Sequence, residues 1–384
     1  MRKTQSEAEK EITKLFGEDS VFFSGDDLNM KKVQHIRTGA PSLDEALGIG
    51  GIPRGRIIQL AGKESSGKTM LALSCIKNYL NENPQNTALF IDAEYTYDPD
   101  WASKLGVDTQ RVMVIKTNEA KKVFDGLIGI ANPNSKTGNK KVKGILDFVK
   151  EGSDPRFKNL GIIVLDSVAA LSTPQEEESE AGKMNVASLA RFLTTELKKL
   201  TPVLAETNVA FIGINQLREA IGVMYGPNTS SPGGRALKHA CSVMIEMGPV
   251  GGSLKENSDG VTIGHKVRVS IKKNKVGRPF GKTEYSIEYT RGMVDTEEEL
   301  LDLCVKYNII KRPNNVTYEF MDNKFRGRAA CIEGMKDFDL LKLEDTVRSN
   351  YIDKIKIQFE ESEEEIEEES EELENPLLGD IDVG

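Results

Sequence analysis

The stretch Gly62-Lys63-Glu64-Ser65-Ser66-Gly67-Lys68-Thr69 matches the phosphate-binding pattern G-x-x-x-x-G-K-[ST] at every fixed position. It follows the apolar run Arg56–Ala61 and precedes the helix-like run Met70–Ser74. This order distinguishes a phosphate-binding loop from a chance match, because the strand anchors the loop and the helix N-terminus attracts an anion. An ordinary glycine-rich turn is the alternative, and the context disfavours it. The stretch predicts a nucleoside-triphosphate site in an α/β protein.

The residues of this loop suggest distinct roles in binding a triphosphate. Gly62 and Gly67 allow the tight turn in which backbone N–H groups face the phosphates. We expect the Lys68 ammonium to reach the β- and γ-phosphates and the Thr69 hydroxyl to hold Mg²⁺. The predicted cofactors are therefore ATP and Mg²⁺. The loop residues expected to bind them are Gly62, Ser65, Ser66, Gly67, Lys68 and Thr69.

Composition limits the class of protein. The chain has 384 residues, 38% of them hydrophobic, which suffices for two or three domains with sizeable cores. No apolar run approaches the roughly 20 residues that cross a bilayer, and the polar N-terminus lacks the apolar core of a signal peptide. We therefore expect a cytoplasmic protein without a membrane partner. The cysteines form no C-x-x-C pair, which favours buried thiols over zinc ligands or disulfides: Cys75, Cys241, Cys304 and Cys331.

The net charge of −9 is unevenly distributed along the chain. Residues 360–384 hold thirteen Asp or Glu and no Lys or Arg, which leaves 47 acidic against 51 basic residues in the body. Such a tail can compete for an anion-binding surface of the body. It can equally be a solvated, disordered tail that aids solubility, and both interpretations remain open.

Strand-like and helix-like segments alternate over the central part of the chain. Helical patterns such as Lys68–Leu80 and Ala187–Ala205 separate several apolar runs. This alternation predicts a mostly parallel sheet covered on both faces, with ligands at the carboxyl ends of the strands. The predicted strands are Ile57–Ala61, Ala88–Asp92, Val112–Ile115, Gly161–Asp166, Val209–Asn215, Ser242–Met247 and Lys266–Lys272.

Shifts in composition divide the chain into four parts. Residues 1–32 form an N-terminal segment with a short helix over Glu7–Phe16, and residues 33–294 form the α/β core. Residues 295–350 form a small α+β domain, and residues 351–384 are the acidic tail, expected to be disordered. Within the core, residues 131–158 interrupt the alternation with an exposed basic loop at Asn132–Lys141 and a short helix at Ile145–Val149.

Two acidic residues end strands that we expect to lie beside the phosphate-binding loop. Asp166 ends the run Ile162–Leu165 and is expected to complete the Mg²⁺ site. Glu94 follows the run Phe90–Ala93 and is expected to orient and deprotonate the attacking water. The alternative for Glu94 is a surface acid in a salt bridge.

A third strand leads into the amide of Gln216, which could bond a γ-phosphate or the water beside it. The segments Leu217–Pro232 and Glu176–Val186 follow two strand ends and read as loops that either grip an extended polymer or merely connect elements. Lys272–Lys275 gathers positive charge, as solvated lysines or as groups that reach a neighbouring subunit's phosphate.

Taken in order, these segments resemble the RecA family of strand-exchange recombinases, and the resemblance extends to phage-type members of that family. The resemblance covers about residues 8–345, and several blocks in register are far more specific than a phosphate-binding loop alone. The chain departs from the family pattern in three places. The segment 131–158 looks like an insertion of unknown role, the first DNA loop has one extra residue early and one fewer later, and His239 replaces an aromatic residue of the family. The resemblance is densest at Thr38–Asp44, Gly62–Thr69, Phe90–Pro99, Leu165–Leu171, Asn215–Gly226, Gly233–Lys238 and Lys273–Phe280.

The resemblance implies a role for each matched nucleotide-site residue. It makes Lys68, Glu94 and Gln216 catalytic, with Glu94 as the base and Gln216 as the nucleotide sensor. Further residues would surround the nucleotide: Asp98, Trp101 and Tyr289 at the adenine, and Lys273 and Lys275 reaching across the subunit interface to a neighbour's phosphates. Trp101 stands where the family has a tyrosine, which preserves stacking on the base.

The resemblance also implies DNA loops and a filament. Two loops would contact DNA through Met184, Arg191, Arg218, Ile221, Gly233 and Gly234. Partners would be single-stranded and double-stranded DNA, further copies of the chain in a helical filament, and single-strand-binding and loader proteins. The N-terminal segment would pack on the next subunit.

The function expected is that of a DNA-dependent ATPase that forms a filament on single-stranded DNA and catalyses homologous pairing and strand exchange in recombinational repair. Three alternatives remain open at this point. They are a non-catalytic scaffold that uses ATP only to hold subunits together, a hexameric motor on the same core, and an ATPase that acts on protein.

Overall fold

The computed structural model describes residues 33–131, 141–178, 186–219, 229–230 and 234–352, together with Glu11 and Lys14. Several predictions lie outside these residues: most of the Glu7–Phe16 helix, nearly all of the acidic tail, and the DNA-loop residues Met184, Ile221 and Gly233. The chain divides into two compact units, Met1–Gln34 and His35–Gly384, and the central sheet with its covering helices belongs to the second.

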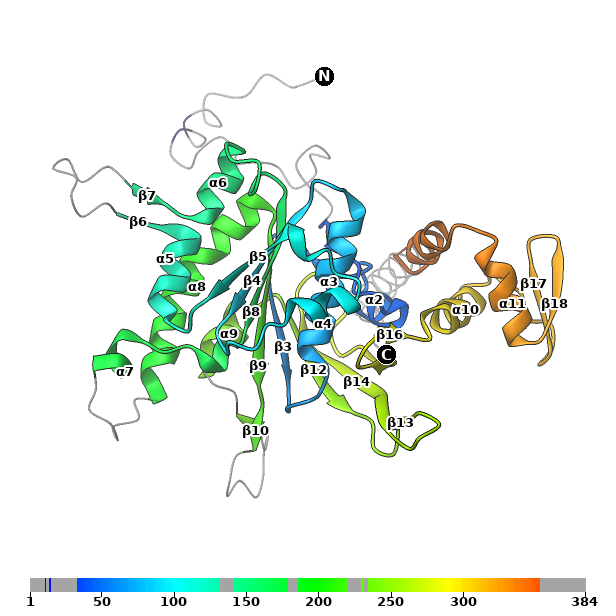
Figure 1. Cartoon of the computed structure of the whole chain (residues 1–384). Helices are drawn as coiled ribbons and strands as arrows, with labels where there is room; N and C mark the ends of the chain where they lie inside the picture. Colours follow the sequence, from blue (N-terminus) through cyan, green and yellow to red (C-terminus); the bar gives the residue numbers. More distant parts are fainter. Residues whose placement is uncertain are drawn as a thin grey trace, which may run out of the picture. The chain divides into compact units, whose positions relative to one another are not determined.

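The centre of the fold is one sheet in the order β16-β15-β14-β12-β3-β9-β8-β4-β5, with β13 paired to β14 (Figure 1). Neighbours from β12 to β5 are parallel, whereas β13, β14, β15 and β16 pair antiparallel. The bounds are β3 Ile57–Gly62, β4 Thr87–Asp92, β5 Val112–Lys116, β8 Leu160–Asp166, β9 Ala210–Gln216, β12 Val243–Pro249, β13 Lys255–Glu256, β14 Thr262–Asn274, β15 Lys282–Glu288 and β16 Gly292–Val294.

All seven predicted strands are present, and the mostly parallel sheet is confirmed. The seventh, predicted over Lys266–Lys272, is longer than expected: β14 covers thirteen residues. It runs antiparallel to both of its neighbours, β12 and β15. Its connection to β15 is short, and only a longer crossover could have returned β15 in the parallel direction. Strands β15 and β16, which extend the sheet beyond β14, are not among the predicted strands.

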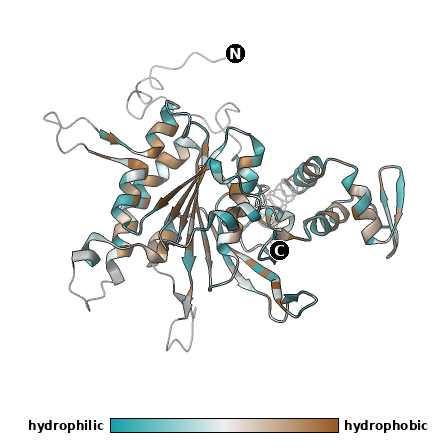
Figure 2. Cartoon of the chain, in the orientation of Figure 1, coloured by the Kyte–Doolittle hydropathy of each residue, from teal (hydrophilic) through white to brown (hydrophobic). Residues whose placement is uncertain are grey.

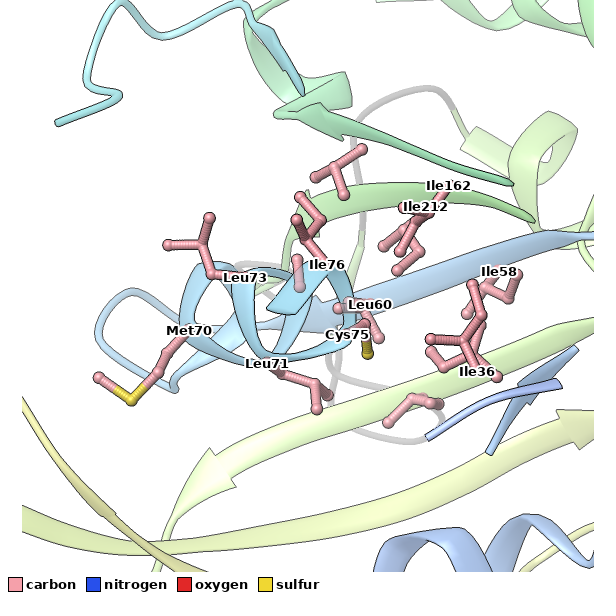
Figure 3. Packing of buried hydrophobic residues seen from close by; sticks show 14 of the residues in the cluster. Ile36, Ile58, Leu60, Met70, Leu71, Leu73, Cys75, Ile76, Ile162 and Ile212 are labelled. Carbon is pink, nitrogen blue, oxygen red and sulfur yellow. The ribbon is translucent and has the colours of Figure 1, made fainter. Parts of the chain in front are cut away.

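Helices cover both faces of the sheet and enclose two separate hydrophobic clusters. On one face, α3 (Lys68–Glu82) packs on alternate strand residues such as Ile58, Leu60 and Ile212, as Figure 3 shows. On the other, α5, α6 and α8 cover Ile57, Leu89 and their neighbours. The central parallel strands are accordingly apolar along their length in Figure 2, as expected when both faces of a parallel sheet are buried. The helices are α2 Pro41–Leu47, α4 Pro99–Lys104, α5 Ala120–Ile128, α6 Ile145–Glu151, α7 Pro174–Glu178, α8 Val186–Thr207 and α9 Gly234–Ala240.

The described part of the segment 131–158 contains a strand that the sequence did not predict. β6 (Gly129–Ala131) pairs antiparallel with β7 (Lys141–Lys143), so Lys141 belongs to a strand rather than to the exposed loop. Two further short ladders join β1 (His35–Ile36) to β2 (Ile52–Pro53) and β10 (Arg218–Glu219) to β11 (Thr229–Ser230). The helix predicted at Ile145–Val149 is confirmed as α6.

Residues beyond β16 build a third hydrophobic cluster. It contains α10 (Thr296–Lys306), the hairpin of β17 (Thr317–Phe320) and β18 (Asn323–Arg326), α11 (Arg328–Lys336) and a helix that covers 340–352. Polar contacts tie this part to α2: Glu45 accepts hydrogen bonds from Lys306 Nζ and Tyr307 Oη, both at 2.6 Å.

All four cysteines are free and buried, as predicted. Among the helices of the described ranges, none combines the length and apolar character that a bilayer crossing requires.

Candidate active site

The phosphate-binding loop connects β3 to α3 at the carboxyl end of the sheet. Gly67 precedes α3 with φ of 83°, in the left-handed region that favours glycine. At Gly62 a β-carbon would lie 2.4 Å from the Met247 carbonyl oxygen and 2.5 Å from Ser66 Oγ. The two glycines that the pattern requires are therefore needed sterically as well.

Lys68 lies folded back over this loop and is only 8% exposed. Its Nζ donates to the carbonyl oxygens of Lys63 at 2.6 Å and Gly62 at 3.1 Å, and lies 3.3 Å from Ser66 Oγ. Burial lowers the pKa of the Lys68 ammonium, an effect that nearby carboxylates, Asp166 first, oppose. A desolvated cation among neutral loop oxygens is a favourable site for a phosphate group.

The Thr69 hydroxyl donates to Asp166 Oδ2 at 2.6 Å. Asp166 ends β8, two strands away from β3, and is 6% exposed. Burial raises the pKa of Asp166 to about 6, and the Glu94 carboxylate adds to the rise, whereas the Thr69 hydroxyl and Lys68 lower it. A hydroxyl and a carboxylate side by side are hard oxygen donors, which suits Mg²⁺.

Glu94 follows β4, the next strand along the sheet from β8, and is exposed. Its Oε1 accepts a hydrogen bond from Ser167 Oγ. The turn after it is shaped by Asp92, whose fully buried carboxylate accepts the backbone N–H groups of Thr96 and Tyr97, each at 3.0 Å. Adjacent strand ends therefore place Glu94 beside Ser167, the residue after Asp166.

Gln216 ends β9, which lies between β3 and β8. It pairs in register with Gly62, and the next backbone N–H, of Leu217, donates to the Gly62 carbonyl at 3.1 Å. The buried Asn215 side chain accepts the Gln216 N–H at 3.0 Å. Asp166, Glu94 and Gln216 thus lie at or just after the ends of neighbouring strands, and Lys68 and Thr69 begin the helix that follows the end of β3. The five residues share one edge of the sheet although they are spread over 149 positions of sequence.

The residues implied at the adenine also come together. Asp98 caps α4, where its Oδ1 accepts the N–H groups of Asp100 at 2.8 Å and Trp101 at 3.2 Å. Trp101 Nε1 donates to the Tyr289 carbonyl at 2.8 Å, across 188 positions of sequence.

Lys273 and Lys275 lie at the end of β14 and just beyond it. Lys273 Nζ donates to the carbonyl oxygens of Lys238 at 2.7 Å and His239 at 3.1 Å, at the C-terminal end of α9. Lys275 is exposed. Within one chain, Lys273 is thus tied to the helix that follows the Leu217–Pro232 segment.

The residues implied in DNA contacts are only partly described. Arg191 is exposed on α8, Arg218 belongs to β10, and Gly234 begins α9. Strand β10 pairs with β11, Arg218 opposite Ser230, so the Leu217–Pro232 segment begins with a short ladder. Glu176–Val186 is not wholly a loop, because Pro174–Glu178 is helical as α7.

Sequence reasoning assigned no role to four residues whose side chains contact the predicted site residues or shape the turn beside them: Asp92, Ser167, Asn215 and His265. The first three flank residues that were singled out, and a polar side chain next to a strand-end acid or amide was the available signal. His265 alternates with Val267, Val269 and Ile271, a period of two that indicates a buried side chain on β14.

Known proteins are similar to this chain over most of its length. The RecA N-terminal domain family matches residues 3–135 and 145–294. Similar curated proteins include Protein RecA of Frankia casuarinae, 41% identical over 302 residues, or 79% of each chain. Protein RecA of Paenarthrobacter aurescens is 38% identical over 80% of each chain, and that of Mycoplasma mycoides 35% identical over 86% of this chain and 87% of its own. The chain therefore belongs to the RecA family, the DNA-dependent ATPases that exchange strands in recombinational repair.

Proposed function

We propose that this chain carries out ATP-driven strand exchange as a helical filament on single-stranded DNA, with ATP and Mg²⁺ held at the edge formed by β3, β9, β8 and β4. The observation that carries this proposal is the convergence on that edge of Lys68, Thr69, Asp166, Glu94 and Gln216. ATP binding is a property of the family. The role assigned to each of these residues is our proposal.

Lys68 and the loop N–H groups bind the phosphates, and Thr69 and Asp166 hold Mg²⁺. The residues fit both, since Gly62 and Gly67 carry no β-carbon at the two fixed glycine positions of the loop and a hydroxyl already lies against a buried carboxylate. Bound Mg²⁺ would neutralise charge on the phosphate oxygens. Ser65 and Ser66 contribute as part of the loop.

Glu94 acts as the general base. It is exposed, so water reaches it, and the Ser167 hydroxyl fixes one of its carboxylate oxygens. Gln216 reports the state of the nucleotide, because it lies next to Gly62 in the sheet and leads directly into the Leu217–Pro232 segment. Loss of a bond to the γ-phosphate would be passed to that segment.

In the filament, Lys273 and Lys275 reach the phosphates bound by a neighbouring subunit. Residues 1–32 are the oligomerisation segment, 33–294 the ATPase core and 295–350 a small separate domain, and the tail at 351–384 restrains uptake of duplex DNA. We place the contacts with DNA at Met184, Arg191, Arg218, Ile221, Gly233 and Gly234. We also propose that the protein is cytoplasmic. Its further partners are single-strand-binding proteins and loader proteins.

The test is ATP turnover with and without single-stranded DNA, for the wild type and for Glu94→Gln. We expect strong stimulation by DNA in the wild type and a loss of about 10²–10⁴-fold in the variant, the usual contribution of a general base. Glu284→Gln, which alters an exposed carboxylate on β15, is the matched control. Full turnover by Glu94→Gln would remove Glu94 from the mechanism, and turnover indifferent to DNA would refute the coupling.

A further inference from the structure

Tyr289 is held at three points although its side chain is 40% exposed. Its backbone N–H donates to the Ile263 carbonyl at 2.9 Å, and its own carbonyl accepts Trp101 Nε1 at 2.8 Å. Its hydroxyl lies 3.2 Å from His265 Nδ1. An aromatic ring fixed at its backbone and at its far end, with much of its surface open, has the properties of a preformed stacking surface.

Of these three contacts, the one with His265 is the contact that fixes the far end of the Tyr289 ring. The imidazole is 4% exposed, at a position of β14 that faces the hydrophobic cluster together with Val267. The His265 and Tyr289 rings lie 5.8 Å apart between centroids, at 55° to each other. Nε2 is buried without a hydrogen-bond partner among the described residues, so the Tyr289 hydroxyl is the one polar contact of this imidazole there.

A buried imidazole with one unsatisfied nitrogen is costly to the fold, and an apolar residue would suit this position better. Burial lowers the pKa of His265, which favours the neutral form of the ring. A neutral imidazole suits this position beside the hydrophobic cluster. It can still hydrogen-bond the Tyr289 hydroxyl, and no charge is then buried next to the Tyr289 ring.

We propose that His265 is a positioning residue of the nucleobase subsite, which fixes the ring of Tyr289 through its hydroxyl so that Tyr289 and Trp101 together present a preorganised surface to adenine. This inference rests on the proposed nucleotide site. It adds a residue that does not contact the base and acts only through Tyr289.

The first measurement establishes whether the subsite senses the base. Trp101 is the single tryptophan of the chain, so its emission reports this place alone. We expect ATP to change the emission and inorganic tripolyphosphate, which carries no base, to leave it unchanged. Equal responses to the two would overturn the nucleobase subsite, and this inference with it.

The second measurement isolates His265 by calorimetric titration of ATP and of tripolyphosphate. We expect His265→Ser to weaken ATP binding by about three- to tenfold, the worth of one hydrogen bond, and to leave tripolyphosphate binding unchanged. His265→Asn should restore ATP binding, since an amide can present a polar atom near the position of Nδ1. Lys266→Ser, the neighbouring exposed position of β14, should behave as the wild type.

A double-mutant cycle with Tyr289→Phe closes the test. If His265 acts through the hydroxyl, Tyr289→Phe weakens ATP binding by the same factor and the double variant loses nothing further. Additive losses, equal losses for ATP and tripolyphosphate, or wild-type affinity in His265→Ser would each overturn the role of His265. A base-specific Trp101 signal would in those cases leave the proposed nucleotide site standing.

Discussion

The Thr69 hydroxyl lies 2.6 Å from Asp166 Oδ2 and joins the first turn of α3 to the end of β8. The two residues are 97 positions apart in sequence, and their contact is the most direct link between the phosphate-binding loop and the acidic strand ends. Both oxygens suit Mg²⁺, so the pair leads to the first prediction.

Thr69→Val keeps the branched side chain and removes the hydroxyl. We expect the variant to need on the order of ten times more Mg²⁺ for half-maximal ATP turnover, because one oxygen donor and the orientation of Asp166 are lost. Thr69→Ser, which retains the hydroxyl, is the control. A Mg²⁺ titration of turnover checks this, and identical curves for valine and threonine would exclude Thr69 as a ligand.

Gly62→Ala should abolish nucleotide binding. The new β-carbon would lie 2.4 Å from the Met247 carbonyl oxygen, a backbone atom of the adjacent strand that cannot move without shifting the sheet. Gly248→Ala lies next to Met247 and meets no atom within 4 Å, so it should retain ATP affinity. Titration of both variants with ATP decides the matter, and wild-type affinity in Gly62→Ala would contradict the steric argument.

Lys273→Ala should reduce DNA-stimulated ATP turnover at least tenfold, if Lys273 reaches a neighbour's phosphates. Loss of its two bonds to the end of α9 should lower the free energy of unfolding by only about 0.3–1 kcal/mol, as for other cations at helix C-termini. Lys272→Ala removes an exposed lysine 3.6 Å from Glu246 and should turn over ATP normally. A large loss of stability with intact turnover would make Lys273 a structural residue instead.

Glu299 should make stability depend on pH near neutrality. Burial raises the pKa of Glu299 from 4.5 to about 7, helped by Asp295 and Asp302, while its bond from the Ser42 N–H opposes the rise. Between these two pH values the folded chain holds a proton that the unfolded chain has lost. The free energy of unfolding therefore falls as pH rises through this window, by on the order of 1–3 kcal/mol.

Urea unfolding of the wild type and of Glu299→Gln at pH 5 and pH 8 measures this dependence. The glutamine variant should lose less stability between the two pH values than the wild type does. Glu298→Gln, which changes an exposed acid on the same helix, should retain the dependence. Parallel behaviour of Glu299→Gln and the wild type would show that other groups cause it.

Local sequence patterns account for much of the core. The run before Gly62 is a strand and the run after Gly67 is a helix, because apolar periodicity and glycine positions act over a few residues. Alternation of the two element types predicts a parallel sheet, and therefore places the strand-end residues Glu94, Asp166 and Gln216 on one edge.

Other features depend on contacts that no local pattern encodes. The antiparallel addition of β15 and β16 follows from a short turn after β14, and the β6–β7 hairpin follows from pairing across the segment 132–140. Nothing in the sequence indicated a role for His265, because its partner Tyr289 is 24 positions away.

The sequence by itself determined the phosphate-binding loop, the alternation of strands and helices in the parallel part of the sheet, and the strand-end residues, since each depends on neighbours along the chain. Only the tertiary structure decided which side chains are in contact. Thr69 contacts Asp166, Glu94 contacts Ser167, and Tyr289 contacts both Trp101 and His265. The physical reason is that hydrogen bonds act over about 3 Å, and only the register of the sheet and the packing of α3 and α4 bring distant residues within that distance.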